Sequence, residues 1–159
     1  GKFTMKTLFS KLSNTPKAKQ LVWCNGALII IALLMLVSSI QMEALAGDGL
    51  FGISFTTLTF IHAGFGVAMF SLVAWHLYLH FGGLQWLKKL GKSVKLTKAL
   101  AIFGSVCLAS GLFILIYMLS TFEHNLVGAI HGKIGFVFLA LGAFHIAKHR
   151  QWIHKKIFA

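Results

Sequence analysis

Residues 62–80 read HAGFGVAMFSLVAWHLYLH, and residues 131–149 read HGKIGFVFLALGAFHIAKH. In each stretch the first histidine is followed by a second after fourteen residues and by a third after eighteen. The two stretches are offset by 69 residues throughout, and they also match at Gly66 with Gly135. They therefore form an internal repeat, carried by two apolar segments, whose histidines occupy equivalent positions.

The spacing of the histidines has a physical meaning on a helix. Fourteen residues advance ~21 Å along the axis and return to within ~40° of the same direction. His62 and His76 therefore share one face, about two thirds of a bilayer apart, and so do their counterparts in the second copy. The third histidine, His80 or His149, points in nearly the same direction ~6 Å further along. Each repeat thus offers two well-separated imidazoles and one neighbour.

The composition and the length of the apolar runs place the chain in a membrane. Apolar residues make up 57% of the sequence, charged residues make up 11%, and there is a single proline. Four apolar runs are each long enough to cross the hydrocarbon core as a helix, at about residues 21–40, 58–79, 99–119 and 126–147. Because short connections join these runs, the sequence predicts an all-α integral membrane protein, a four-helix up-down-up-down bundle.

The basic residues follow the expected topology. A lysine-rich segment at residues 1–20 precedes the membrane domain at 21–154, and a short tail follows at 155–159. Of the fifteen lysines and arginines, all but Lys133 fall in three groups, at residues 2–19, 88–98 and 148–156. The three acids fall in the other two loops, at Glu43, Asp48 and Glu123. By the positive-inside rule, both termini and the middle loop are cytoplasmic, as expected for an integral protein of a bacterial inner membrane.

The net charge of +12 is therefore a consequence of membrane topology. Bases gathered on the cytoplasmic side suit the anionic headgroups of the inner leaflet. This distribution argues against a nucleic-acid partner and makes the lipid bilayer the expected partner.

The repeated histidines are expected to meet in pairs. The second and fourth helices of such a bundle run parallel and face each other diagonally, so His62 lies level with His131 and His76 lies level with His145. An unpaired imidazole at bilayer depth costs on the order of several kcal/mol, so each pair is expected to share a ligand. Imidazole suits iron, copper and zinc.

A haem satisfies two imidazoles without further protein ligands, because the porphyrin supplies the other four. Zinc takes four ligands in a tetrahedron, often with carboxylates or thiolates among them, and no acid lies within the four spans. The fifteen phenylalanines and sixteen glycines suit the apolar faces of a porphyrin. Cys24 and Cys107 belong to no CxxCH motif, so covalent attachment is not expected. The pattern favours two non-covalent, six-coordinate haem b groups.

Over about residues 21–154 the chain resembles two groups of membrane cytochromes. A four-helix bundle whose second and fourth helices each bring two histidines about fourteen residues apart is similar to the haem-bearing core of cytochrome b from respiratory quinol-oxidising complexes. The segments AWHLYLH and AFHIAKHRQWI resemble the small four-helix flavinylation-associated cytochromes. The resemblance implies that the haem irons are ligated by His62, His131, His76 and His145. The membrane cytochromes of formate dehydrogenase and nickel-iron hydrogenase differ, because their first helix supplies a ligand and the first span here has no histidine.

The haem nearer the cytoplasmic side, here called the inner haem, has two candidate ligands in each copy of the repeat: the second histidine and the third. His149 lies between Lys148 and Arg150 at headgroup depth, where a haem propionate would end. We therefore favour the second histidine of each copy as the inner ligand. The third histidines, His80 and His149, are expected to contact that ligand or a propionate.

Three further residues are candidates for roles beside the outer haem. Glu123 and His124 lie together in the outer turn and are candidate proton acceptors for a bound quinol. Lys133 follows His131 by two residues, and it either pairs with an outer haem propionate or extends to the surface.

These features predict a cytochrome that passes electrons across the bilayer between two stacked haems. The expected donor is membrane quinol or a protein on one face, and the acceptor is a redox partner protein, a flavin or a small oxidant on the other. The chain would then be a quinol-linked oxidoreductase or the cytochrome subunit of one. Two alternatives stay open: a haem-carrying or haem-transfer membrane protein, and a haem-free, histidine-lined transporter of metal ions or protons.

Overall fold

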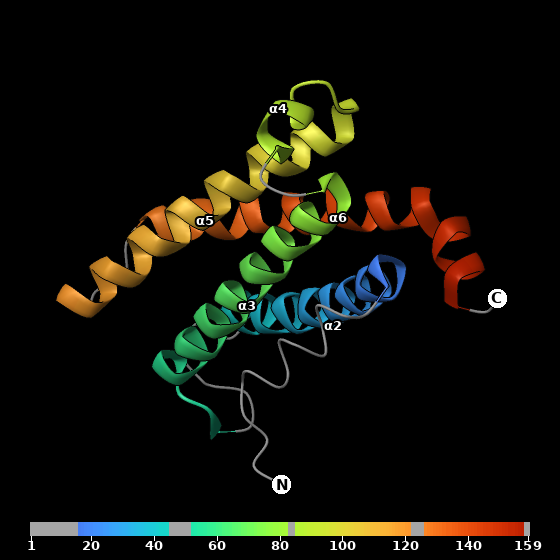
Figure 1. Ribbon diagram of the computed structural model, residues 1–159. Helices are drawn as coiled ribbons and strands as arrows, with labels where there is room; N and C mark the ends of the chain where they lie inside the picture. Colours follow the sequence, from blue (N-terminus) through green and yellow to red (C-terminus); the bar gives the residue numbers. More distant parts are fainter. Residues whose placement is uncertain (1–15, 45–51, 83–84, 122–125, 158–159) are drawn as a thin grey trace, which may run out of the picture.

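The computed structural model describes residues 16–44, 52–82, 85–121 and 126–157. These residues contain no strand and five helices: α2 (Lys17–Ala44), α3 (Phe55–Phe81), α4 (Trp86–Leu90), α5 (Lys95–Thr121) and α6 (Leu126–Ile157). All but α4 are long and apolar enough to cross a membrane. The all-α, four-helix membrane fold expected from the sequence is thereby confirmed (Figure 1).

The four long helices form two hairpins that pack against each other. Helix α2 packs along α3, and α5 packs along α6, while α2 also contacts α6 and α3 contacts α5 (Figure 1). Each long helix therefore has two neighbours, and α3 and α6 lie on a diagonal of the bundle. This is the packing of an up-down-up-down bundle, in which the first helix neighbours the fourth. The two histidine-bearing helices consequently face each other across the interior.

The inner end of α3 is held by local contacts. Gly82 ends the helix in a left-handed conformation with a φ of 75°, and its N–H donates to the carbonyl of Tyr78. A residue with a Cβ adopts this φ only with strain, so glycine suits the position. Lys89 of α4 donates from Nζ to the carbonyl of Phe81 at 2.8 Å, which also places a cation at the negative end of the helix. These contacts fix the turn that carries His80.

The helices extend beyond the apolar runs that predict them. The first run ends at about residue 40, whereas α2 continues to Ala44, and the fourth run ends at about residue 147, whereas α6 continues to Ile157. Part of the tail expected at 155–159 therefore belongs to α6, and the basic loop contains the short helix α4. Hydropathy marks only the part of a helix that crosses hydrocarbon, while backbone hydrogen bonding continues into the headgroup region.

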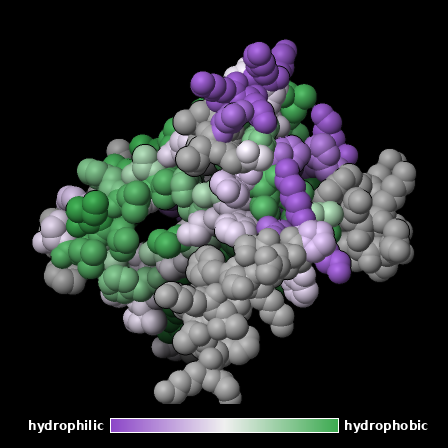
Figure 2. Space-filling model, viewed as in Figure 1, coloured by the Kyte–Doolittle hydropathy of each residue, from purple (hydrophilic) through white to green (hydrophobic). Residues whose placement is uncertain are grey.

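Many large apolar side chains of the long helices are exposed. Trp23, Ile116 and Phe144 are 76%, 67% and 70% exposed. Exposed apolar area costs about 25 cal/mol per Å² in water, so this surface requires lipid around it (Figure 2). Among the residues that the structure describes, the buried hydrophobic side chains are few: Cys24, Ile31, Leu58, Met69 and Leu79.

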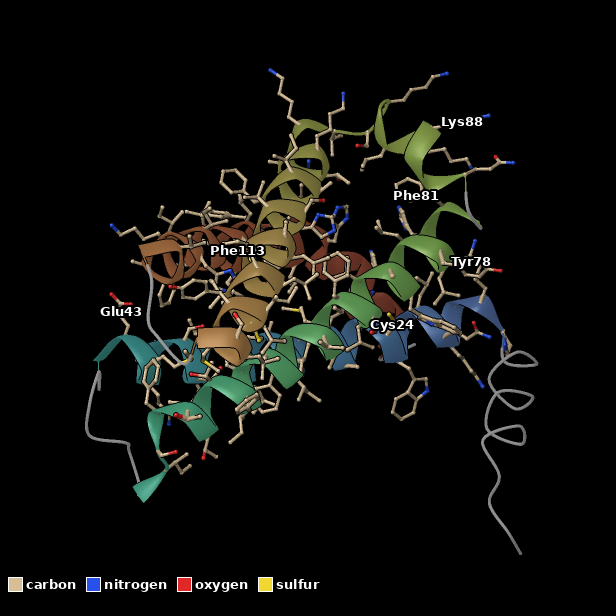
Figure 3. The ribbon with its side chains drawn as sticks, turned by 90° about the vertical axis from the view of Figure 1, so that its left-hand side faces the viewer. Cys24, Glu43, Tyr78, Phe81, Lys88 and Phe113 are labelled. Carbon is tan, nitrogen blue, oxygen red and sulfur yellow. The ribbon has the colours of Figure 1, made fainter. Side chains whose placement is uncertain are left out.

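The charged ends of the structure lead to a prediction of topology. Hydrophilic side chains gather at the α4 end, where Lys88 lies, and Glu43 lies at the opposite end (Figures 2 and 3). By the positive-inside rule, the lysine-rich end is expected to face the cytoplasm. Reporter fusions after residues 45 and 123 are therefore expected to report the outside, and fusions after residue 92 and at the C-terminus the inside. A cytoplasmic signal from the fusion at 45 would reverse the two faces of the bundle.

Candidate functional site

The first histidines of the two repeats meet inside the bundle. The ring centroids of His62, on α3, and His131, on α6, are 6.3 Å apart, and the ring planes are perpendicular. Both side chains are half-buried. The structure thus brings these two residues, here called the outer pair, close together, as the parallel arrangement of the two helices predicts.

Each imidazole of the outer pair is held by a serine from the preceding long helix. Ser38 Oγ, on α2, lies 2.9 Å from His62 Nδ1, and Ser110 Oγ, on α5, lies 2.9 Å from His131 Nδ1. Ser38 is only 3% exposed, so its bond is made in the interior of the bundle. Because Nδ1 of each ring is engaged, Nε2 is the nitrogen available to a further ligand.

The other four histidines of the repeats lie nearer the α4 end of the bundle, and we call them the inner group. On α3, the rings of His76 and His80 are nearly parallel with centroids 5.8 Å apart. On α6, the rings of His145 and His149 are 4.8 Å apart at an angle of 50°. His76 interacts electrostatically with His145 and His149 of the facing helix. The inner histidines of α3 and α6 therefore lie within electrostatic range of one another.

Burial distinguishes the second histidines of the repeats from the third. His76 is half-buried, and its Nδ1 lies 2.8 Å from Asn25 Oδ1 of α2. His145 is half-buried too, and its Nδ1 is a buried polar atom without a hydrogen-bond partner in the described part of the chain. By contrast, His80 and His149 are exposed. A buried polar atom without a partner is unusual, so burial and this orphan nitrogen set His145 apart from the exposed His149.

Glycines on α5 allow α6 to approach closely. A Cβ on Gly104 would lie 3.0 Å from Phe138 Cε2, and a Cβ on Gly111 would lie 3.0 Å from His131 Cε1. Any side chain at Gly111 would therefore displace an imidazole of the outer pair. A Cβ on Gly66 of α3 would meet no atom within 4 Å, so α3 keeps free space one turn beyond its outer histidine.

The donor set suits a haem better than a bare metal ion. The described residues contain no group of three or more histidines, cysteines or acids placed to hold a metal ion. A haem iron needs only two axial imidazoles. With metal–nitrogen bonds of ~2.0–2.1 Å, two imidazoles on one metal have ring centroids roughly 6–6.5 Å apart. The 6.3 Å separation in the outer pair fits this requirement.

One acid lies close to α6 at the residue that follows the outer histidine. Glu43, in the last turn of α2, has its Oε2 atom 4.0 Å from where a Cβ on Gly132 would lie, directly after the outer histidine of α6 (Figure 3). Lys133, the next residue, is exposed. The candidate proton acceptors Glu123 and His124 lie outside the described residues.

The residues that hold the imidazoles do not stand out in the sequence. Ser38 and Ser110 match small residues used for helix packing, and Asn25 is a single polar residue in an apolar run. The two serines are 72 residues apart, so the repeat offset of 69 pairs Ser38 with Cys107 instead. One feature of the sequence could have pointed to these residues: each is a polar side chain, on a span without histidine, at about the depth of a histidine on a neighbouring span.

The fold and the two histidine sites define a class: a four-helix membrane protein whose second and fourth long helices meet through an outer histidine pair and an inner histidine group. No protein-family model, curated protein or solved structure matches this chain. The geometry of the histidines is therefore the feature of this chain from which a function can be inferred.

Proposed function

We propose that this protein is a di-haem b-type cytochrome of the membrane, similar in design to the haem core of cytochrome b and to the flavinylation-associated cytochromes. The observation that supports this most directly is the outer pair. Two half-buried imidazoles from facing helices lie 6.3 Å apart, each with Nδ1 bonded to a serine. The internal repeat presents a second set of imidazoles ~21 Å further along the same helices. Two sets of imidazoles meet the needs of two haems.

In this proposal His62 and His131 hold the outer haem, and His76 and His145 hold the inner haem. Bound haem supplies one-electron redox chemistry, and the protein supplies ligation, spacing and exclusion of water. The remaining basic residues near the two sites suit the propionates. Lys133 is exposed beside the outer pair, and the third histidines of the repeats are exposed in the inner group.

Electron exchange with membrane quinone is proposed beside the outer pair. A quinol hydroxyl loses a proton as an electron leaves, so a base is needed within reach of the donor. Glu43 is a carboxylate in this position and takes the proton in our proposal. Glu123 and His124 are further candidates for the second proton. A redox partner protein, a flavin or a small oxidant would exchange electrons at the opposite face, where the lysines of α4 are exposed.

The test of this function is reduction of the purified protein by two reagents. Dithionite and a quinol analogue are both expected to give the spectrum of reduced low-spin haem b. Glu43→Gln is expected to slow reduction by the quinol by roughly 100-fold or more, because a positioned base contributes about that factor. Reduction of the same variant by dithionite is expected to be unchanged, and Glu43→Asp is expected to retain much of the quinol rate.

Each other outcome supports a different function. Haem that is reduced by dithionite but by no quinol, and that passes readily to an acceptor protein, would indicate a haem carrier. Protein that stays colourless when haem is supplied would indicate a haem-free transporter of metal ions or protons.

A further inference from the structure

We infer that Ser38 and Ser110 are positioning residues that decide which nitrogen of each outer histidine faces the haem iron. The inference rests on the proposed haem function. It gives a role to α2 and α5, which contain no histidine, in the ligation carried out by α3 and α6.

The single hydroxyl proton of Ser38 is assigned by its surroundings. Ser38 Oγ lies 3.0 Å from the carbonyl oxygen of Met35, which is able only to accept. The hydroxyl therefore donates to Met35 and accepts from His62, whose Nδ1 lies 2.9 Å away. Nδ1 of a neutral His62 then carries the ring proton, and Nε2 keeps the lone pair that a metal needs.

The same assignment applies to Ser110. Its Oγ lies 2.8 Å from the carbonyl oxygen of Val106 and 3.1 Å from that of Cys107, so its proton is directed to the backbone of α5. The oxygen then accepts from His131 Nδ1 at 2.9 Å. Both outer histidines are thus held with Nδ1 protonated and Nε2 free for the metal.

The two halves of the chain make this bond from different turns of helix. Cys107 precedes His131 by 24 residues, as Ser38 precedes His62, but its Sγ lies 3.9 Å from His131 Nδ1, and a thiol is a weak acceptor. Ser110 lies one turn later on the same face and supplies an oxygen at hydrogen-bond distance. The two serines occupy different positions relative to their histidines, yet both form a hydrogen bond to Nδ1. A residue needed only for close packing would not have to form this bond, so we take the bond as the feature that the two halves share.

The inner group lacks this symmetry. His76 has the Asn25 amide oxygen on its Nδ1, whereas His145 Nδ1 has no partner among the residues that the structure places. An acceptor on Nδ1 makes an imidazole a stronger electron donor, which stabilises ferric iron. The outer haem, with two such acceptors, is therefore expected to have the lower reduction potential. Lys148, three residues after His145 on α6, acts in the same direction because its charge favours the added electron.

The experiment uses the purified, haem-loaded full chain with Ser38→Ala and Ser110→Ala. Each substitution is expected to shift the equilibrium between oxidised and reduced outer haem about tenfold toward the reduced form. This raises the midpoint potential of that haem by ~59 mV, since one electron is transferred. Loss of the outer haem to an acceptor globin is expected to be roughly 10-fold to 100-fold faster, as found when outer-shell partners of metal ligands are removed. Ser38→Thr keeps the hydroxyl and is expected to restore both values.

Ser71→Ala and Ser120→Ala are the matched controls. These serines also donate to a carbonyl of their own helix, at 2.9 Å and 2.8 Å, and neither hydrogen-bonds to a histidine in the described structure. If the wild-type protein holds haem but Ser38→Ala and Ser110→Ala behave like these controls, the positioning role is refuted and the proposed function is not. A wild type without haem would refute the proposed function as well. If one alanine variant fails to fold, the other and Ser38→Thr decide the question.

Discussion

Substitution of either outer histidine, by His62→Ala or His131→Ala, is expected to lower the haem content of the purified protein from two per chain to one. Each substitution removes one of two axial imidazoles, and the remaining one cannot hold a six-coordinate low-spin iron by itself. The partner imidazole is left half-buried with a free nitrogen, which further destabilises the site. A pyridine haemochrome assay and the reduced spectrum measure the loss.

The control for the outer variants is His154→Ala, which removes the same side chain outside the repeat. It is expected to retain two haems. A wild type that contains one haem per chain would show that one of the two histidine sites is structural, and the variants would identify which. Equal loss of both haems from His62→Ala would contradict the independence of the two sites.

The fold was predictable because it follows from the coarsest features of the sequence. Four runs of apolar residues decide the number of long helices, and the short connections between them decide that neighbours are antiparallel. The pairing of His62 with His131 then follows, since equivalent positions on two parallel helices lie at one level. The sequence predicted this common level, while the separation of 6.3 Å between the two rings comes from the structure.

The partners of the imidazoles were not predictable in the same way. Whether Ser38 reaches His62 depends on the rotation and sliding of α2 against α3, and apolar helices in lipid carry little pattern to set either. The same holds for Glu43, which reaches α6 only because α2 continues a turn beyond its apolar run. Helix ends and interhelical register are decided by contacts that hydropathy does not report.

The sequence favoured His145 over His149 as the inner ligand from its depth alone, because both candidates lie on the same face of α6. His145 and His149 are one turn apart, so helix geometry treats them alike. The structure adds differences of burial and hydrogen bonding. His145 is half-buried with an unpaired Nδ1, and His149 is exposed.

His145→Ala is accordingly expected to lose the inner haem, whereas His149→Ala is expected to keep it. A ligand at His145 lies about one turn deeper in the bilayer, where water competes less for the metal. On α3 the matching ligand is His76, whose ring is already oriented by Asn25 at 2.8 Å. Removal of His149 takes away a ring 4.8 Å from that of His145, so it is expected to shift the potential of the inner haem without releasing it.

Measurements of haem content and of midpoint potential in His145→Ala and His149→Ala decide between the two ligands. The corresponding variants on α3 are His76→Ala and His80→Ala. Loss of the inner haem from His149→Ala, with retention in His145→Ala, would reverse the assignment. The ligand spacing along each helix would then be eighteen residues. The irons would stand about 27 Å apart along the helix axis instead of ~21 Å. Electron transfer between the haems would be slower, because tunnelling through protein weakens steeply with distance.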